Sequence, residues 1–152
     1  MHVAVIGPAD AASQELADAE EVGRRLADAE AVVVCGGRGG VMEAVCRGAR
    51  SAGGLTLGIL PGRDRSEANP FVEVAVPTGL GEARNALVVR SADAVVAIGG
   101  AYGTLSEIAF ALRTGVPVVG IGSWALDDVV DAPGPREAVE LALALADERA
   151  AG

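Results

Sequence analysis

The residues best suited to chemistry lie in one stretch of the sequence, IGGAYGTLSE at positions 98–107. Its glycines, Gly99, Gly100 and Gly103, allow backbone N–H groups to approach an anion closely. A helix that begins beside them would add a partial positive charge at its N-terminus. Glu107 would then supply a carboxylate next to a bound phosphate, so the stretch is typical of a phosphate site with an acidic group beside it.

The same stretch also fits a capping box, a common way for a helix to begin. Thr104 would be the N-cap, and Glu107 at position N3 would reach back to the N-cap N–H. Arg84, in the segment TGLGEARNALVVR, favours the phosphate site, because it stands at the entrance of the helix before the same strand. Its planar guanidinium could hold a phosphate or a carboxylate. Both interpretations of the stretch remain open at this point.

Two further glycine turns follow apolar runs, Gly7-Pro8 after the first run and GGRGG at positions 36–40 after the second. A single turn of this kind is equally well explained as a tight strand-to-helix connection, and Arg38 could be a solvated loop arginine or reach a ligand phosphate. The recurrence of such turns favours a shared anion site. Its candidate residues here are Gly7, Gly36, Gly37, Arg38, Gly39 and Gly40. The G-x-G-x-x-G pattern is absent after the first run, which disfavours NAD and FAD.

Short β-branched runs alternate with stretches of helical spacing, and most of the runs are apolar on both faces. This alternation predicts an α/β fold, a three-layer Rossmann-like domain over residues 1–152 with a mainly parallel, doubly wound sheet. The expected strands are 3–6, 31–35, 55–60, 72–76, 94–98 and 116–121. The expected helices are 12–26, 41–52, 81–91, 105–114 and 135–150.

The segment PGRDRSEANP at 61–70 is too rich in charge, proline and glycine for a confident helix. Ten extended residues span three strand spacings, about 14 Å. The segment is therefore a candidate to carry the chain across the sheet, over the carboxyl edge where ligands bind in such folds.

Composition excludes several function classes. The net charge of −9 disfavours nucleic acid and an anionic membrane surface as partners. All 12 basic residues are arginine, so no lysine is available to form a Schiff base with PLP. One histidine and two cysteines give little support to a metal site. The N-terminus lacks the features of a secretory signal, and no apolar run is long enough to span a bilayer, so we expect a soluble, cytoplasmic protein.

Four segments, GGRGGVMEAVCRGA, GGLTLGILPG, ANPFVEVAVPTGLGEARN and IGGAYGTLSEIAFAL, resemble in order the LOG-related Rossmann-like superfamily, formerly called lysine decarboxylase-like. The resemblance is greatest to its branch of molybdenum cofactor carrier proteins. In LOG enzymes, a Pro-Gly-Gly-x-Gly-Thr-x-x-Glu motif and an upstream Arg-Lys pair serve hydrolysis of nucleoside 5′-monophosphates to base and ribose 5-phosphate. The resemblance implies these counterparts: Arg84 for the arginine, Gly99, Gly100, Gly103 and Thr104 for the phosphate loop, and Glu107 for the glutamate.

Two positions depart from the LOG pattern. Ile98 replaces the proline, and Asn85 replaces the lysine beside Arg84. Both are features of the carrier-like branch. They favour binding of a phosphorylated ligand, a molybdenum cofactor or a nucleotide, by a carrier or sensor that needs no other cofactor. The alternatives are a phosphoribohydrolase with Arg84 and Glu107 as catalytic residues, and a partner-binding protein whose glycine loops are only turns.

The helix expected after Gly103 is apolar around much of its circumference, with Ala109, Phe110 and Leu112 on different sides. Such a helix favours burial against a second subunit. Together with the family resemblance, it predicts a homo-oligomer, a dimer or a tetramer.

Overall fold

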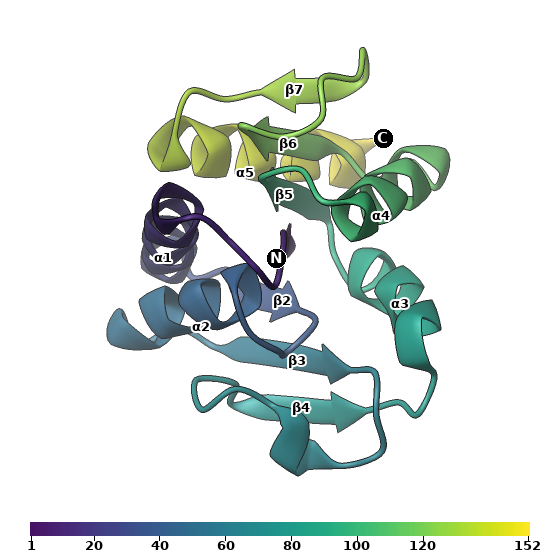
Figure 1. Ribbon diagram of the computed structural model, residues 1–152. Helices are drawn as coiled ribbons and strands as arrows, with labels where there is room; N and C mark the ends of the chain where they lie inside the picture. Colours follow the sequence, from purple (N-terminus) through teal and green to yellow (C-terminus); the bar gives the residue numbers. More distant parts are fainter.

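Seven parallel strands form one sheet through the middle of the protein, in the order β4-β3-β2-β1-β5-β6-β7 (Figure 1). The computed structural model describes residues 1–152. The strands are β1 His2–Ile6, β2 Val32–Cys35, β3 Thr56–Leu60, β4 Val74–Pro77, β5 Ala94–Ile98, β6 Val118–Ile121 and β7 Val129–Asp131. Every neighbouring pair is parallel. All seven strands therefore end at the same edge of the sheet.

Helices cover both faces of the sheet. The helices are α1 Ser13–Asp28, α2 Val41–Ser51, α3 Arg84–Arg90, α4 Tyr102–Arg113 and α5 Pro135–Ala151, with short 3-10 helices at Arg65–Glu67 and Gly81–Ala83. Helices α1, α2 and α5 pack on one face, and α3 and α4 pack on the other (Figure 1). The structure confirms the predicted three-layer α/β fold with a doubly wound parallel sheet.

Alternation along the central strands explains why both faces are covered. In β1, Val3 and Val5 belong to the core under α1, α2 and α5, whereas Ala4 and Ile6 belong to the core under α3 and α4. Successive side chains of a strand point to opposite faces. Because all four are almost fully buried and apolar, a helix layer is required on each side.

The strand order reverses direction between β1 and β5. The chain first winds outward from β1 to β4, then returns through α3 to β5 and winds outward on the other side. In sheets of this kind, ligands bind at this switch point, beyond the carboxyl ends of the strands. The site is therefore expected where the turns after β1 and β5 meet.

The prediction that residues 61–70 carry the chain across the sheet is wrong. These residues connect β3 to its direct neighbour β4, and the crossing is made later, by α3. A short edge strand after a charged loop leaves no sequence signal of its position in the sheet. Strand β7 was also not predicted, because its three residues, Val129–Asp131, are too few to give a period-two pattern.

Helix α4 buries only part of its apolar surface within this chain. Ile108 and Ala111 are fully buried against the sheet, Phe110 and Leu112 are half-buried, and Ala109 is exposed. The partner subunit expected on this helix stays a prediction. None of the helices combines the length and the apolar character that crossing a membrane requires.

Candidate functional site

The three glycine turns meet at the switch point. A Cβ atom on Gly7, after β1, would lie 2.7 Å from the carbonyl oxygen of Ile98, at the end of β5. On the other side of Gly7, the N–H of Val41 donates a hydrogen bond to the carbonyl oxygen of Pro8 over 3.1 Å. The turn after β1 therefore lies between the turns after β2 and β5, and the carboxyl edge of three adjacent strands is lined by glycine.

Arg84 joins this edge from α3. Its Nη2 donates a hydrogen bond to the carbonyl oxygen of Gly36 over 3.3 Å, and its Nη1 donates to the side-chain oxygen of Asn85. A Cβ atom on Gly36 would lie only 2.6 Å from the Arg84 Nη2. Glycine at position 36 is thus what lets the guanidinium lie against the turn after β2.

The charge of Arg84 is only partly compensated. Burial lowers the pKa of its guanidinium, and the nearby Glu107 carboxylate opposes that shift. Its Nε atom is buried and has no hydrogen-bond partner. A half-buried guanidinium with unused donor capacity is a site that favours an anion.

The capping-box interpretation of residues 104–107 is wrong. Helix α4 begins at Tyr102, its N-cap is Ala101 in an extended conformation, and no side chain caps it. Thr104 is already inside the first turn and is only 3% exposed, and Glu107 lies one turn further along. The Glu107 side chain is therefore too far along the helix to serve the N-cap N–H.

Glu107 instead lies half-buried between α4 and α3. Burial raises the pKa of its carboxyl from the ordinary 4.5 to about 7, against the opposing effect of Arg84. The group therefore holds a proton over part of the neutral range. A carboxyl poised in this way can donate or accept a hydrogen bond, and such perturbed groups cluster at functional sites.

A cleft of about 630 Å³ opens between α3 and α4 and includes Glu107 and Asn85. Gly103 forms part of its wall, and a Cβ atom there would have no neighbour within 4 Å. The remaining lining residues are Glu82, Ala83, Ala86, Tyr102, Ser106 and Phe110. Its volume lies within the usual range for small-molecule sites, about 300 to 1,000 Å³.

Glu15 reaches the same edge and was not predicted. Its Oε2 atom is buried without a hydrogen-bond partner, and a Cβ atom on Gly99 would lie 2.5 Å from it. A signal existed in the sequence, since Glu15 lies in the first turn of α1, the helix after the Gly7 turn. Nothing in the sequence placed this turn beside Gly99, because that contact depends on the pairing of β1 with β5.

Replacing Gly99 by alanine should destabilise the protein by about 1 to 2 kcal/mol. Gly99 has φ of +71°, a left-handed conformation that costs a residue with a Cβ atom roughly that much, and the new methyl group would press on Glu15. Gly103→Ala is the matched control, since that glycine lies in α4 with open space around it. Urea unfolding checks this, and equal midpoints for the two variants would contradict it.

Some other residues that were predicted to bind the ligand already form contacts within the protein. Arg38 forms an ion pair with Glu67 at 3.2 Å, and its carbonyl oxygen accepts a hydrogen bond from the Asn69 side chain at 2.9 Å. Gly37 is buried against Leu60 of β3. The segment at 61–70 thus braces the turn after β2 and uses part of the charge of Arg38, while Gly39, Gly40 and Gly100 remain at least partly accessible.

Two cysteines lie beneath the turn after β2. The Sγ atoms of Cys35 and Cys46 are 3.5 Å apart and both residues are buried free thiols. The N–H of Gly37 donates to the Cys35 sulfur over 3.3 Å. The hydrogen bond with Cys35, and then burial, raise the pKa of the Cys46 thiol. Cys35 thus supports the turn from below as a packed core residue.

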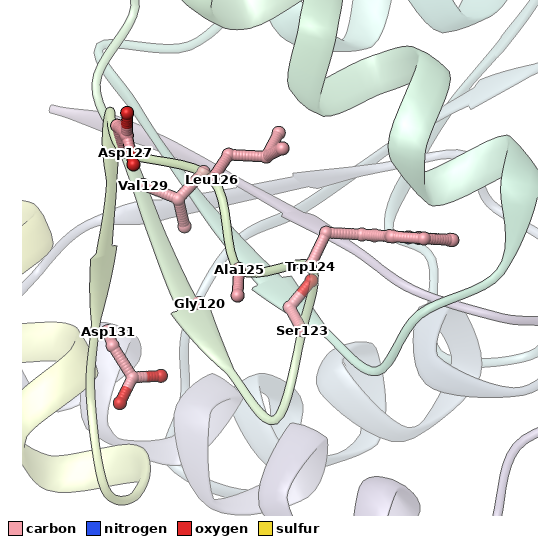
Figure 2. Close-up of a pocket in the computed structure, with 8 residues that line it drawn as sticks. All are labelled: Gly120, Ser123, Trp124, Ala125, Leu126, Asp127, Val129 and Asp131. Carbon is pink, nitrogen blue, oxygen red and sulfur yellow. The ribbon is translucent and has the colours of Figure 1, made fainter.

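A second, smaller cavity of about 240 Å³ lies between β6 and the segment leading into β7 (Figure 2). Two carboxylates, Asp127 and Asp131, are part of its lining, and the buried Ser123 hydroxyl oxygen has no hydrogen-bond partner. No arginine lines this cavity to offset the two carboxylates. Glu82 and Glu107 also line the cleft between α3 and α4, but there the guanidinium of Arg84 lies close to Glu107, so the edge beside Arg84 is the better candidate for the phosphate of a ligand.

Comparison with known proteins agrees with this architecture. An uncharacterised protein of Archaeoglobus fulgidus is 42% identical over 121 residues, which cover 80% of each chain. The molybdenum cofactor binding protein of Rippkaea orientalis superposes with a TM-score of 0.90 at 36% identity, over 95% of this chain and 96% of that one. The molybdenum cofactor carrier protein of Chlamydomonas reinhardtii gives 0.86 at 34% identity, over 95% and 96%.

The family model described as the SLOG cluster4 family matches residues 1–149. Together with the solved carrier proteins, this match confirms the resemblance that the four sequence segments indicated. Because the match covers nearly the whole chain, the protein belongs to the SLOG cluster4 family.

Proposed function

We propose that the protein binds a phosphorylated small molecule at the carboxyl edge of its sheet and holds it as a carrier or sensor. The observation that carries this proposal is the guanidinium of Arg84. It lies half-buried beside the glycine turns, with its Nε atom unpartnered, in a protein of net charge −9. A local cation in an acidic protein selects a small anion rather than a polyanion.

The ligand we propose is a pterin of the molybdenum cofactor type, with a nucleotide as the second possibility of the same class. Support comes from the two solved relatives, which are described as binding or carrying the molybdenum cofactor and which share about a third of their residues with this chain. Both ligands combine a phosphate with a planar heteroaromatic ring, so one anion site serves either.

Each group at the edge has a proposed part in binding. The backbone amides of the turns 36–40 and 99–103 that no protein group already binds, with Gly7 between them, would hold phosphate oxygens, and Arg84 would neutralise their charge. The N–H groups of Gly37 and Gly99 are not among them, because they donate to the Cys35 sulfur and to the Ile121 carbonyl oxygen. Asn85, with its oxygen already bound to Arg84, has its NH₂ group free to donate. Thr104 is buried, so its part would be to fix the start of α4.

Hydrolysis of a nucleoside 5′-monophosphate is the second candidate function, and one observation favours it. Glu107 combines a pKa of about 7 with a position in the cleft, close enough to Arg84 for each to influence the other's pKa. In such a reaction Glu107 would stabilise or hydrate the oxocarbenium-like ribosyl centre, and Arg84 would hold the phosphate.

Incubation of the wild-type protein with AMP or GMP should leave the nucleotide intact, while molybdenum cofactor released from a molybdoenzyme should stay with the protein through gel filtration. Chromatography of free base and mass spectrometry of bound molybdenum check the two parts. Release of base at a rate that falls at least a hundredfold in Glu107→Gln would support the hydrolase instead, because a catalytic carboxylate acts on the transition state. Retention of neither ligand type would refute the proposal.

A further inference from the structure

Tyr102 is the only tyrosine of the chain, and it is 84% exposed at the first residue of α4. No other large apolar or aromatic side chain is as exposed; Leu80 follows at 53%. Exposure alone needs no explanation in a single side chain. The position of Tyr102 does need one, because Tyr102 lies within the glycine turn at 99–103 and lines the cleft that contains Glu107.

The ring of Tyr102 is supported from one side. It stacks on Trp124 with the ring centroids 6.0 Å apart and the planes 28° from parallel. The indole N–H of Trp124 donates a hydrogen bond to the carbonyl oxygen of Ala101 over 3.2 Å, which fixes the indole against the turn. Figure 2 shows the Trp124 side chain extending away from the other residues of the small cavity. The stack thus orients Tyr102 and leaves most of its surface open.

The cleft beside Tyr102 has groups that suit the edge of a heteroaromatic ring. The half-buried Glu107 carboxyl can accept hydrogen bonds from ring N–H and amino groups, and the Asn85 NH₂ group can donate to a ring nitrogen or carbonyl. Phe110 adds a half-buried apolar surface. At Gly103 the absence of a side chain leaves the space beside the ring empty.

We propose that Tyr102 is a stacking platform for the planar heteroaromatic ring of the bound ligand, and that this ring occupies the cleft between α3 and α4. The inference rests on the proposed function, because it assumes that the phosphate of the same ligand is held at the glycine turns and Arg84. Asn85 lines the cleft and accepts a hydrogen bond from Arg84, and Gly103 belongs both to the turn at 99–103 and to the wall of the cleft, so the phosphate site and the cleft adjoin each other.

The test compares ligands with and without a heteroaromatic ring. GMP shares its aminopyrimidinone edge with a pterin, and ribose 5-phosphate has the same sugar and phosphate without the base. Molybdenum cofactor released from a molybdoenzyme forms a parallel arm. Affinities are measured by titration. The fluorescence of Trp124, the only tryptophan, is the signal for each ligand that changes it. Tyr102→Ala should weaken binding of the ring-bearing ligands roughly 5- to 150-fold, the usual range for loss of one aromatic stack. Ribose 5-phosphate should bind unchanged, and Tyr102→Phe should behave as wild type.

Three results would overturn the inference while leaving the proposed function intact. The ring-bearing ligands could bind wild type no better than ribose 5-phosphate. Tyr102→Ala could weaken all ligands equally, which would indicate a structural role. It could also change the mass of the assembly in light scattering without changing affinity, which would make Tyr102 a subunit contact. Failure of every probe to bind the wild-type protein would refute the proposed function, and this inference with it.

Discussion

Replacing Glu107 by glutamine should stabilise the folded protein by about 2 to 4 kcal/mol at pH 8 and by far less at pH 4. The carboxyl has a pKa of about 7 in the folded protein because it is buried, against 4.5 when exposed. Each pKa unit corresponds to about 1.4 kcal/mol. Glutamine resembles the protonated acid in shape, so it avoids the cost of ionisation in the folded state.

The pH dependence gives this prediction its sign. Below pH 4.5 the carboxyl is protonated in both the folded and the unfolded chain, so it adds no pH dependence there. Between pH 4.5 and 7 the unfolded chain has lost the proton while the folded chain still holds it, and the stability of the wild type therefore falls as pH rises. Above pH 7 the carboxyl is ionised in both the folded and the unfolded chain, so the stability of the wild type falls no further through this group. The stability gap between variant and wild type should thus widen from pH 4.5 to 7 and then level off.

Urea unfolding at a series of pH values measures this gap. Glu140→Gln, at an exposed position of α5, is the control for removing one negative charge from a protein of net charge −9. A gap that does not change with pH, or that matches the control, would show that Glu107 ionises as an exposed acid does. A bound anion should raise the pKa of Glu107 further, because like charges disfavour ionisation.

Arg84→Ala should weaken binding of a phosphorylated ligand roughly 10- to 150-fold, the loss expected when a charge-assisted hydrogen bond worth about 1.5 to 3 kcal/mol is removed. High salt should reduce the effect of Arg84→Ala on binding less than it reduces the effect of removing a surface charge, because Arg84 is half-buried. Titration calorimetry with GMP or with the released molybdenum cofactor measures the change.

Arg90→Ala is the matched control for this variant. Arg90 is the last residue of the same helix, α3, and is exposed at the end away from the glycine turns. It tests whether any loss of binding follows from the net charge alone. Equal effects of the two variants on binding would contradict a specific role of Arg84. A loss of binding that results only from unfolding of Arg84→Ala would contradict it as well, and circular dichroism detects such unfolding.

The position of Glu107 was the part of the candidate site least accessible to sequence reasoning. Residues 104–107 satisfy the capping-box pattern, and pattern alone cannot tell which residue starts the helix. In the structure Ala101 takes the extended N-cap conformation, the helix begins at Tyr102, and Glu107 turns toward α3. Its raised pKa depends on the packing of α3 against α4, two segments whose contact no local pattern encodes.

The role of segment 61–70 shows a similar limit. Its length allowed a crossing of the sheet, yet the segment folds back to the neighbouring strand β4 and braces the turn at 36–40 through Glu67 and Asn69. The run at 72–76 predicted a strand where β4 lies, but nothing local indicated that this strand pairs with β3. The edge strand β7 is only three residues long and largely exposed, so it lacks the apolar run that identifies a central strand.

By itself the sequence determined the class of fold and the edge at which the candidate site lies. Apolar β-branched runs separated by helical stretches require a parallel sheet covered on both faces, and parallel strands all end at one edge, so glycine turns after three strands had to lie there together. Only the tertiary structure decided which side chains share that edge. The order of the strands brings Glu15 to Gly99, and the packing of α3 on α4 buries Glu107 beside Arg84 and opens the cleft next to Tyr102. The physical reason is that side-chain contacts and desolvation depend on residues far apart in the chain, whereas periodicity and turn chemistry are local.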